Sequence, residues 1–363
     1  MVDFSPKIGR IDGIDVELHW TFLILLIFIL FLSLYLFAIW VLLFACVLLH
    51  ELVHSITSKR NGIRVKKIVL YPFGGGSIID FDKVSPEIEF RISIVGPLAS
   101  LLLAVAFGIA DLYAPANIVG STLQTLFLLN VFLGVFNLLP WLPLDGGRAL
   151  RSYLQKSRSF LDATRLAVKS SNAVTIIFIM GTVAYAALAH GYSAVYREFI
   201  IVWDVAIAFF IYSGAQAEMQ SALIKENIKG LRARDAATSN YLVVRGTLSM
   251  DKLYKKLMHS ETHIVLFRKG SQVKILSSAS LQKLLKSPKP GAIIADFGTP
   301  IPSIPYSMGL YDAIGRMRSD ESNVAALLKG DTIKGILLMQ HIEAIIALHI
   351  SRKKKTAGNS ANK

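Results

Sequence analysis

The chain alternates long apolar runs with short polar loops over its first 220 residues and then turns polar. Six runs are long enough to cross a bilayer as helices, because about 20 residues at 1.5 Å each match a hydrocarbon core of roughly 30 Å. They lie at about residues 18–37, 38–56, 92–110, 123–139, 173–189 and 199–217. The pattern therefore predicts a polytopic α-helical membrane protein with six transmembrane helices.

Between the second and third runs the pattern changes from helical to extended. β-Branched residues lie on both sides of the turn-forming sequence Gly74-Gly75-Gly76. This arrangement predicts a hairpin or a short sheet near the membrane surface, with a flexible interhelical loop as the alternative.

A loose repeat with a period of about 60 residues follows the last apolar run. Lys269-Gly270-Ser271-Gln272 corresponds to Lys329-Gly330-Asp331-Thr332. Each copy combines helical stretches with short apolar strands, which predicts two β-α-β-β-α units at about 228–288 and 292–350. The chain thus divides into a membrane domain of residues 1–220, a soluble α/β domain of residues 221–350 and a basic, disordered tail of residues 351–363.

The composition agrees with a membrane protein, since 53% of the residues are hydrophobic, 18% are charged and the mean hydropathy is +0.51. The net charge of +14 belongs almost entirely to the polar half. Residues 1–227 carry 17 basic and 16 acidic side chains, whereas residues 228–363 carry 22 and 9. A cytosolic domain beside an anionic leaflet explains this excess. A nucleic-acid partner is not predicted, because no basic stripe with interleaved aromatic residues is present.

The distribution of Lys and Arg among the loops predicts the orientation. The loops between runs two and three and between runs four and five hold seven and six of these residues. The loops after runs one and three hold none, and the loop after run five holds only Arg197. Under the positive-inside rule this alternation places both termini in the cytosol, in a multi-pass protein of the cell membrane.

Three ionisable residues interrupt the second apolar run, in the sequence His50-Glu51-Leu52-Val53-His54. Residues four apart share one face of a helix, so His50 and His54 can bind one metal ion, with Glu51 beside them as a general base. The alternative is a helix with scattered polar residues, but such groups are costly at membrane depth. Asp145 follows the cytosolic end of the fourth run, and topology brings it to the depth of the two histidines as a third ligand.

These residues resemble the site-2 proteases, which are polytopic intramembrane zinc metallopeptidases. The His50–His54 segment resembles the family's H-E-x-x-H motif, and Asn137 to Gly147 resembles its second signature, with Asp145 matching the third zinc ligand. Gly96-Pro97 resembles the small-residue motif of the third core span. The soluble domain resembles a pair of CBS domains.

The resemblance implies a zinc metalloendopeptidase with one catalytic Zn²⁺ held by His50, His54 and Asp145. Glu51 would be the general base, and Asn137 would help to hold the oxyanion or the substrate backbone, with a packing role as its alternative. The implied substrates are single-span transmembrane proteins, which the enzyme cleaves within the bilayer.

The CBS tail is expected to modulate activity through dimerisation or membrane contact. CBS units that bind adenine nucleotides usually carry Ser or Thr and, three residues later, Asp. Here Ser278 is followed by Leu281, and Leu338 by His341, which argues against nucleotide binding. The competing classes are a CBS-regulated transporter or channel and an inactive membrane scaffold. The scaffold would be expected to lack Glu51, and the transporter to carry polar residues in several spans.

Overall fold

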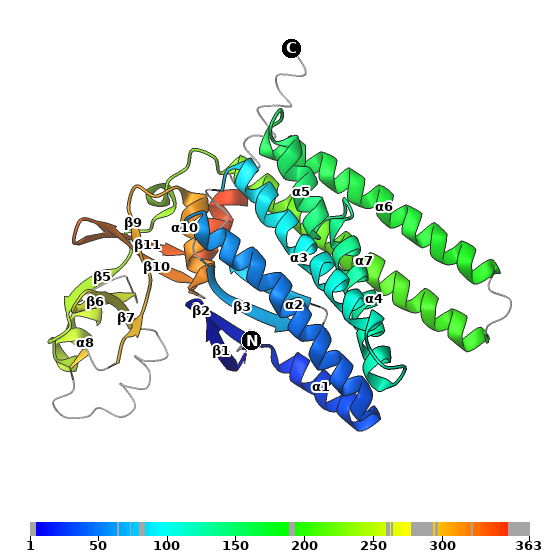
Figure 1. Cartoon of the computed structure of the whole chain (residues 1–363). Helices are drawn as coiled ribbons and strands as arrows, with labels where there is room; N and C mark the ends of the chain where they lie inside the picture. The colour runs from blue at the N-terminus through cyan, green and yellow to red at the C-terminus, as the bar shows by residue number, and fades with distance from the viewer. Residues whose placement is uncertain are drawn as a thin grey trace, which may run out of the picture. The chain divides into compact units, whose positions relative to one another are not determined.

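The computed structural model describes residues 5–63, 65–72, 74–79, 84–188, 193–258, 262, 264–276, 293–294, 297–320 and 322–347. The chain separates into two compact units, Met1–Leu223 and Ile224–Lys363 (Figure 1). The predicted basic tail of residues 351–363 and the second helix of the first repeat, near residue 281, lie outside the described residues.

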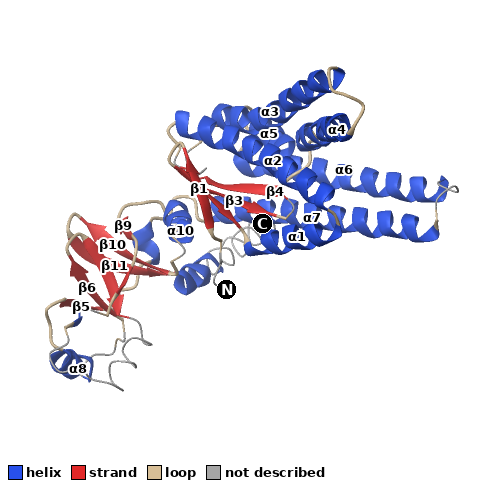
Figure 2. Ribbon diagram, turned by 60° about the horizontal axis from the view of Figure 1, so that its bottom comes forward, coloured by secondary structure: helices blue, strands red, loops and turns tan. Residues whose placement is uncertain are grey.

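Seven helices are described in the first unit. They are α1 (Trp20–Leu32), α2 (Leu34–Arg60), α3 (Pro86–Leu112), α4 (Ile118–Leu138), α5 (Asp145–Leu154), α6 (Phe160–Leu188) and α7 (Ala194–Asn227), whose last residues enter the second unit. Helices α2, α3 and α4 pack side by side (Figures 1 and 2). A Cβ at Gly134 of α4 would meet the Leu101 side chain of α3, so this crossing is close.

Five of these helices, rather than the six predicted, are long and apolar enough to cross a membrane: α2, α3, α4, α6 and α7. The predicted first span is split at Ser33. Its backbone N–H bonds to the Ile29 carbonyl and ends α1, while its hydroxyl accepts a bond from Leu36 N and caps α2. Helix α1 has 13 residues and is about 20 Å long, which is short of a hydrocarbon core of roughly 30 Å.

The predicted hairpin near residue 75 is part of a four-stranded sheet with the order β1-β2-β3-β4. Its strands are β1 (Lys7–Ile11), β2 (Ile14–Leu18), β3 (Val65–Tyr71) and β4 (Gly74–Ile79). β2 is parallel to β3, and the other pairs are antiparallel. Ile14, Ile68 and Leu70 pack against Val47 of α2. The sheet therefore lies along the part of α2 that carries the two histidines (Figure 2).

The second unit contains the predicted repeat. The first copy has β5 (Leu242–Arg245), α8 (Met250–Met258), β6 (Val265–Lys269) and β7 (Gln272–Leu276). The second has β9 (Ser303–Pro305), α10 (Leu310–Ser319), β10 (Val324–Lys329) and β11 (Thr332–Leu338), followed by helical residues 339–347. Gly270 and Gly330 have φ of 63° and 59° in corresponding hairpin turns, which confirms the repeat.

The two copies share an apolar core. The short strand β8 (Thr299–Pro300) completes the first sheet, β5-β6-β7-β8, and the second has the order β11-β10-β9. Leu266 and Val273 of the first copy lie in one buried cluster with Ala326 and Ile336 of the second. This is the soluble α/β arrangement of paired repeats expected for a CBS pair.

Candidate metal centre

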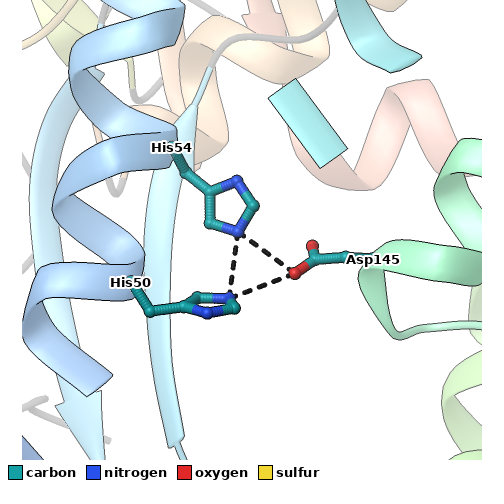
Figure 3. A group of neighbouring side chains, drawn as sticks. All are labelled: His50, His54 and Asp145. Atoms are coloured by element: carbon teal, nitrogen blue, oxygen red, sulfur yellow. Dashed lines mark hydrogen bonds and ion pairs between the residues drawn. The ribbon is translucent and has the colours of Figure 1, made fainter. Parts of the chain in front are cut away.

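Two helices bring the three predicted metal ligands together. His50 and His54 project from the same face of α2 toward Asp145, the first residue of α5 (Figure 3). The two Nε2 atoms are 3.1 Å apart, and each is 3.1 Å from Asp145 Oδ2. Three donor atoms from positions up to 95 residues apart therefore form a triangle with nearly equal edges.

Helix α3 orients both imidazoles through bonds to Nδ1, the ring nitrogen that faces away from Asp145. His54 Nδ1 donates to the carbonyl of Ile92 at 2.6 Å, and His50 Nδ1 pairs with Ser100 Oγ at 2.9 Å. A carbonyl oxygen only accepts, so Nδ1 of His54 carries the proton, and in the neutral ring Nε2 presents its lone pair to the triangle. Such bonds at the far ring nitrogen commonly fix the tautomer of a metal-binding histidine.

The donor set fits a zinc ion. Tetrahedral coordination with bonds of about 2.0–2.1 Å separates ligand atoms by about 3.3–3.4 Å, close to the 3.1 Å edges here. Burial alone would raise the pKa of the Asp145 carboxyl, but the charges of His54 and His50 and their hydrogen bonds lower it below its ordinary value. The carboxyl is therefore ionised, which is the form that a metal requires. When both imidazoles are neutral and carry their protons on Nδ1, two lone pairs and a carboxylate face one another, and a cation between them removes the repulsion.

The loop before α5 fixes the position of Asp145. The Trp141 indole donates to Thr175 Oγ1 at 2.8 Å, and the Leu142 amide donates to Ser171 Oγ at 2.7 Å, both on α6. Cβ atoms at Gly146 and Gly147 would collide with the backbone of residues 138–142. Two glycines after the ligand thus let the first turn of α5 pack directly on the loop.

Gly96 of α3 lies against the two imidazoles. A Cβ built there would overlap the His54 ring and lie 2.8 Å from His50 Nε2. The Gly96-Pro97 motif is therefore located at the metal centre, where the absence of a side chain leaves room for the histidines.

The other predicted residues occupy less defined places. Glu51 is half-buried on α2, and its carboxylate interacts electrostatically with His54. Asn137 is half-buried near the end of α4, where its Nδ2 donates to the Leu133 carbonyl at 2.9 Å. This bond uses one of the two N–H groups of the amide, and the catalytic roles of both residues stay predictions. His19 is the N-cap of α1, where Nδ1 pairs with Thr21.

Sequence reasoning missed the groups that support the ligands. Ile92 contributes only a backbone carbonyl, which leaves no signal in the side-chain pattern. Ser100 was not singled out, yet a hydroxyl inside an apolar span is itself a signal of a hydrogen bond.

Comparison with known proteins identifies the family of this site. The model of peptidase family M50 matches residues 38–115 and 107–182, which include all three candidate ligands. The zinc metalloprotease MJ0392 of Methanocaldococcus jannaschii is 33% identical over 257 residues, covering 69% of this chain and 71% of that protein. The putative zinc metalloprotease Rip3 of Mycobacterium tuberculosis is 29% identical over 332 residues, covering 84% of this chain and 82% of its own.

A solved structure, the site-2 protease from Methanocaldococcus jannaschii, is 35% identical and covers 60% of this chain and 95% of its own, with a TM-score of 0.45. The extent of the match to MJ0392 favours a protease over a transporter, a channel or a scaffold. The chain belongs to peptidase family M50, among the membrane metalloproteases of the site-2 protease type.

Proposed function

We propose that this protein is an intramembrane zinc endopeptidase that cleaves the transmembrane segments of single-span membrane proteins. The observation that carries the proposal is the triangle of the buried His50 and His54 and the half-buried Asp145, placed among helices that are apolar enough to span a bilayer. Two imidazoles and one carboxylate leave a fourth position open, as in catalytic zinc sites.

The protein's own groups supply the proton transfers. A bound Zn²⁺ provides a Lewis acid that polarises a carbonyl and makes water a usable nucleophile near neutral pH. Glu51 accepts the proton of the attacking water and delivers it to the leaving amine. The acceptors on α3, at Ile92 and Ser100, keep both imidazoles facing the reaction. Asn137 donates one amide N–H to the Leu133 carbonyl and would offer the other to the substrate backbone.

The edge of the small sheet is the candidate site for substrate. A helical substrate must unwind before attack, and its freed backbone groups need partners inside a bilayer. β4 pairs with β3 alone among the described strands and packs along α2, the helix that carries the histidines. An unwound segment can add to β4 as a further strand.

Proline substitutions can test strand addition, because neighbouring residues of an antiparallel strand direct their amides to opposite sides. Gly75 pairs with Leu70 and Gly76 with Val69, so one of the two amides faces β3 and the other the free edge. Gly75→Pro and Gly76→Pro should both slow cleavage, but only the variant that breaks the β3–β4 ladder should also lower the midpoint of thermal unfolding. Unchanged cleavage by the more stable variant would exclude β4 as the docking edge.

The decisive experiment combines zinc content with cleavage in reconstituted membranes. The wild-type chain should hold one zinc per chain and cut a single-span substrate, whereas Glu51→Gln should keep the zinc and lose cleavage. Glu198→Gln, at an exposed position of α7, is the matched control. Near-normal turnover by Glu51→Gln would refute the assignment of the base, and wild-type protein without zinc would refute the zinc site.

We also propose that both termini face the cytosol and that the second unit modulates access to the metal centre. The loop charges support the orientation, and the excess of basic residues after residue 227 supports contact with an anionic leaflet. The rate of cleavage by the full chain should depend on the content of anionic lipid. A chain that ends at Leu223 should cleave at a rate that does not depend on it. Equal cleavage by both chains in neutral and anionic vesicles would show that this unit does not regulate through the membrane.

A further inference from the structure

A cluster of buried charges lies in the first unit and takes no part in the proposed chemistry. Arg151 of α5 is 4% exposed and bonds to two carboxylates from different helices. One guanidinium nitrogen donates to Glu218 of α7 at 2.6 Å, and another donates to Glu89 of α3. The guanidinium carbon also lies 5.2 Å from the centroid of the Phe160 ring. Arg151 and Glu89 are both withdrawn from water and need each other's charge, and the half-buried Glu218 adds a second partner.

The cluster joins the two halves of the metal centre. Arg151 follows Asp145 by six residues on the same ten-residue helix. Its partner Glu89 precedes Ile92 by three residues on α3, so both lie on the same face of that helix. Ile92 supplies the carbonyl that orients His54. The Arg151–Glu89 pair therefore ties the helix that bears the carboxylate ligand to the helix that orients the imidazoles.

Helix α7 holds the same segment from another side. A Cβ at Gly214 would overlap the ring of Pro143, two residues before Asp145, so α7 and the loop are in close contact. Glu218 follows one turn later and meets Arg151. Helix α7 thus contacts the Asp145 segment on both sides of the ligand.

We propose that Arg151 is a positioning residue for the metal centre. Through Glu89 and Glu218 it sets α5 against α3 and α7, and so sets the distance between Asp145 Oδ2 and the two imidazole nitrogens. This inference rests on the proposed role of Asp145 as a metal ligand. A planar guanidinium can donate to two carboxylates along different directions and stack on a ring, whereas the ammonium of lysine is a point charge. A positive charge at position 151 is therefore not enough to hold the three helices in this arrangement.

The test measures the metal centre directly, on the full-length protein in detergent. Arg151→Lys keeps the charge and should weaken zinc binding, measured against a competing chelator, by about 10- to 100-fold, as for other residues that support ligands. The ligand-field spectrum of the Co²⁺-loaded protein should shift, since it reports the ligand geometry. Arg165→Lys is the matched control, because Arg165 pairs with Asp162 on the exposed surface of α6 and should change neither quantity.

A second variant keeps the proposal falsifiable if Arg151→Lys does not fold. Glu218→Gln retains a hydrogen-bonding side chain and should shift the cobalt spectrum in the same direction, whereas Glu198→Gln should not. Wild-type spectra and zinc affinity in Arg151→Lys, or in Glu218→Gln where the first variant is unfolded, would overturn the positioning role. Full zinc affinity in Asp145→Ala would instead show that the proposed ligand set is wrong.

Discussion

The two units sort polar and apolar residues in opposite ways. In the first, Phe31, Leu102 and Phe209 are 85%, 70% and 71% exposed, while His50 and Arg151 are buried. In the second, Phe267, Ile304 and Leu327 are fully buried, and among the described residues Thr262 is its one buried polar side chain. In the second unit apolar side chains are buried and polar ones exposed, whereas in the first unit many apolar side chains are exposed and several polar ones are buried.

The difference follows from the solvent of each unit. Lipid does not drive apolar side chains inward, so a membrane unit is held together by close packing and by polar groups that bond to one another. Its buried polar residues include groups that make important contacts: the candidate ligands His50 and His54, Ser100, and Arg151 with Glu89. The second unit is held by an apolar core, which identifies the fold but singles out no site.

Loss of a ligand should have the largest effect on the first unit. His54→Ala should weaken zinc binding by more than about 100-fold, which exceeds the usual effect of losing a supporting residue. The stability of the second unit in this variant should equal that in the wild-type protein. Zinc titration and hydrogen exchange of residues 264–276 measure the two effects. Zinc at full affinity would remove His54 from the ligand set.

An added methyl group at the metal centre should come next. Gly96→Ala places a Cβ against both imidazoles and should lower zinc affinity at least about tenfold, with a loss of about 1–3 kcal/mol in stability from overpacking. Gly181→Ala on α6 is the matched control, because a Cβ there meets nothing within 4 Å. Equal behaviour of the two variants would contradict the close approach described at Gly96.

The same truncation should have different effects in the two units. Leu327→Ala opens a cavity in an apolar core and should destabilise the second unit by about 2–5 kcal/mol without changing zinc affinity. Leu102→Ala removes a side chain that is 70% exposed and should cost less than about 0.5 kcal/mol. Denaturant or thermal unfolding measures both. A large cost at Leu102 would show that this face packs against another protein.

The smallest effect on zinc binding is expected at Ser100. Ser100→Ala removes the partner of His50 Nδ1 and should weaken zinc binding by about tenfold, the lower end of the range for supporting residues. Ser322→Ala is a control of the same chemistry, since Ser322 Oγ donates to the Val324 carbonyl in the second unit at 2.7 Å. Unchanged zinc affinity in Ser100→Ala would show that α2 alone orients His50.

The grouping of the three candidate ligands was predicted from the sequence, but the groups that hold them in place were not. The spacing of His50 and His54 and the position of Asp145 after an apolar run depend only on residue type and helical period. The backbone acceptor at Ile92 has no such signature. Arg151 and its partners lie 62 and 67 residues apart, and nothing local links them.

In the fold, too, the elements with a strong local sequence signal were predicted and those with a weak one or none were missed. Five apolar spans and the hairpin at residues 65–79 were predicted, whereas the break at Ser33 was not, because a serine is compatible with the interior of an apolar helix. β1 was missed because it is exposed on both faces and lacks alternation. β2 does alternate, but it has only five residues and leads directly into the first apolar run. Helix α5 was missed because glycines occupy its first turn, where they serve packing against the loop.

The separation of the ligands along the chain also affects the order in which the enzyme matures. His54 and Asp145 are 91 residues apart, so at about 5–20 residues per second roughly 5–20 s of synthesis separate them. The two histidines enter the membrane with α2, but the carboxylate arrives only after α3 and α4 have been made. A nascent chain therefore lacks the third candidate ligand until most of its membrane unit exists. With Asp145 as a ligand, proteolytic activity would be delayed until the surrounding helices can confine it.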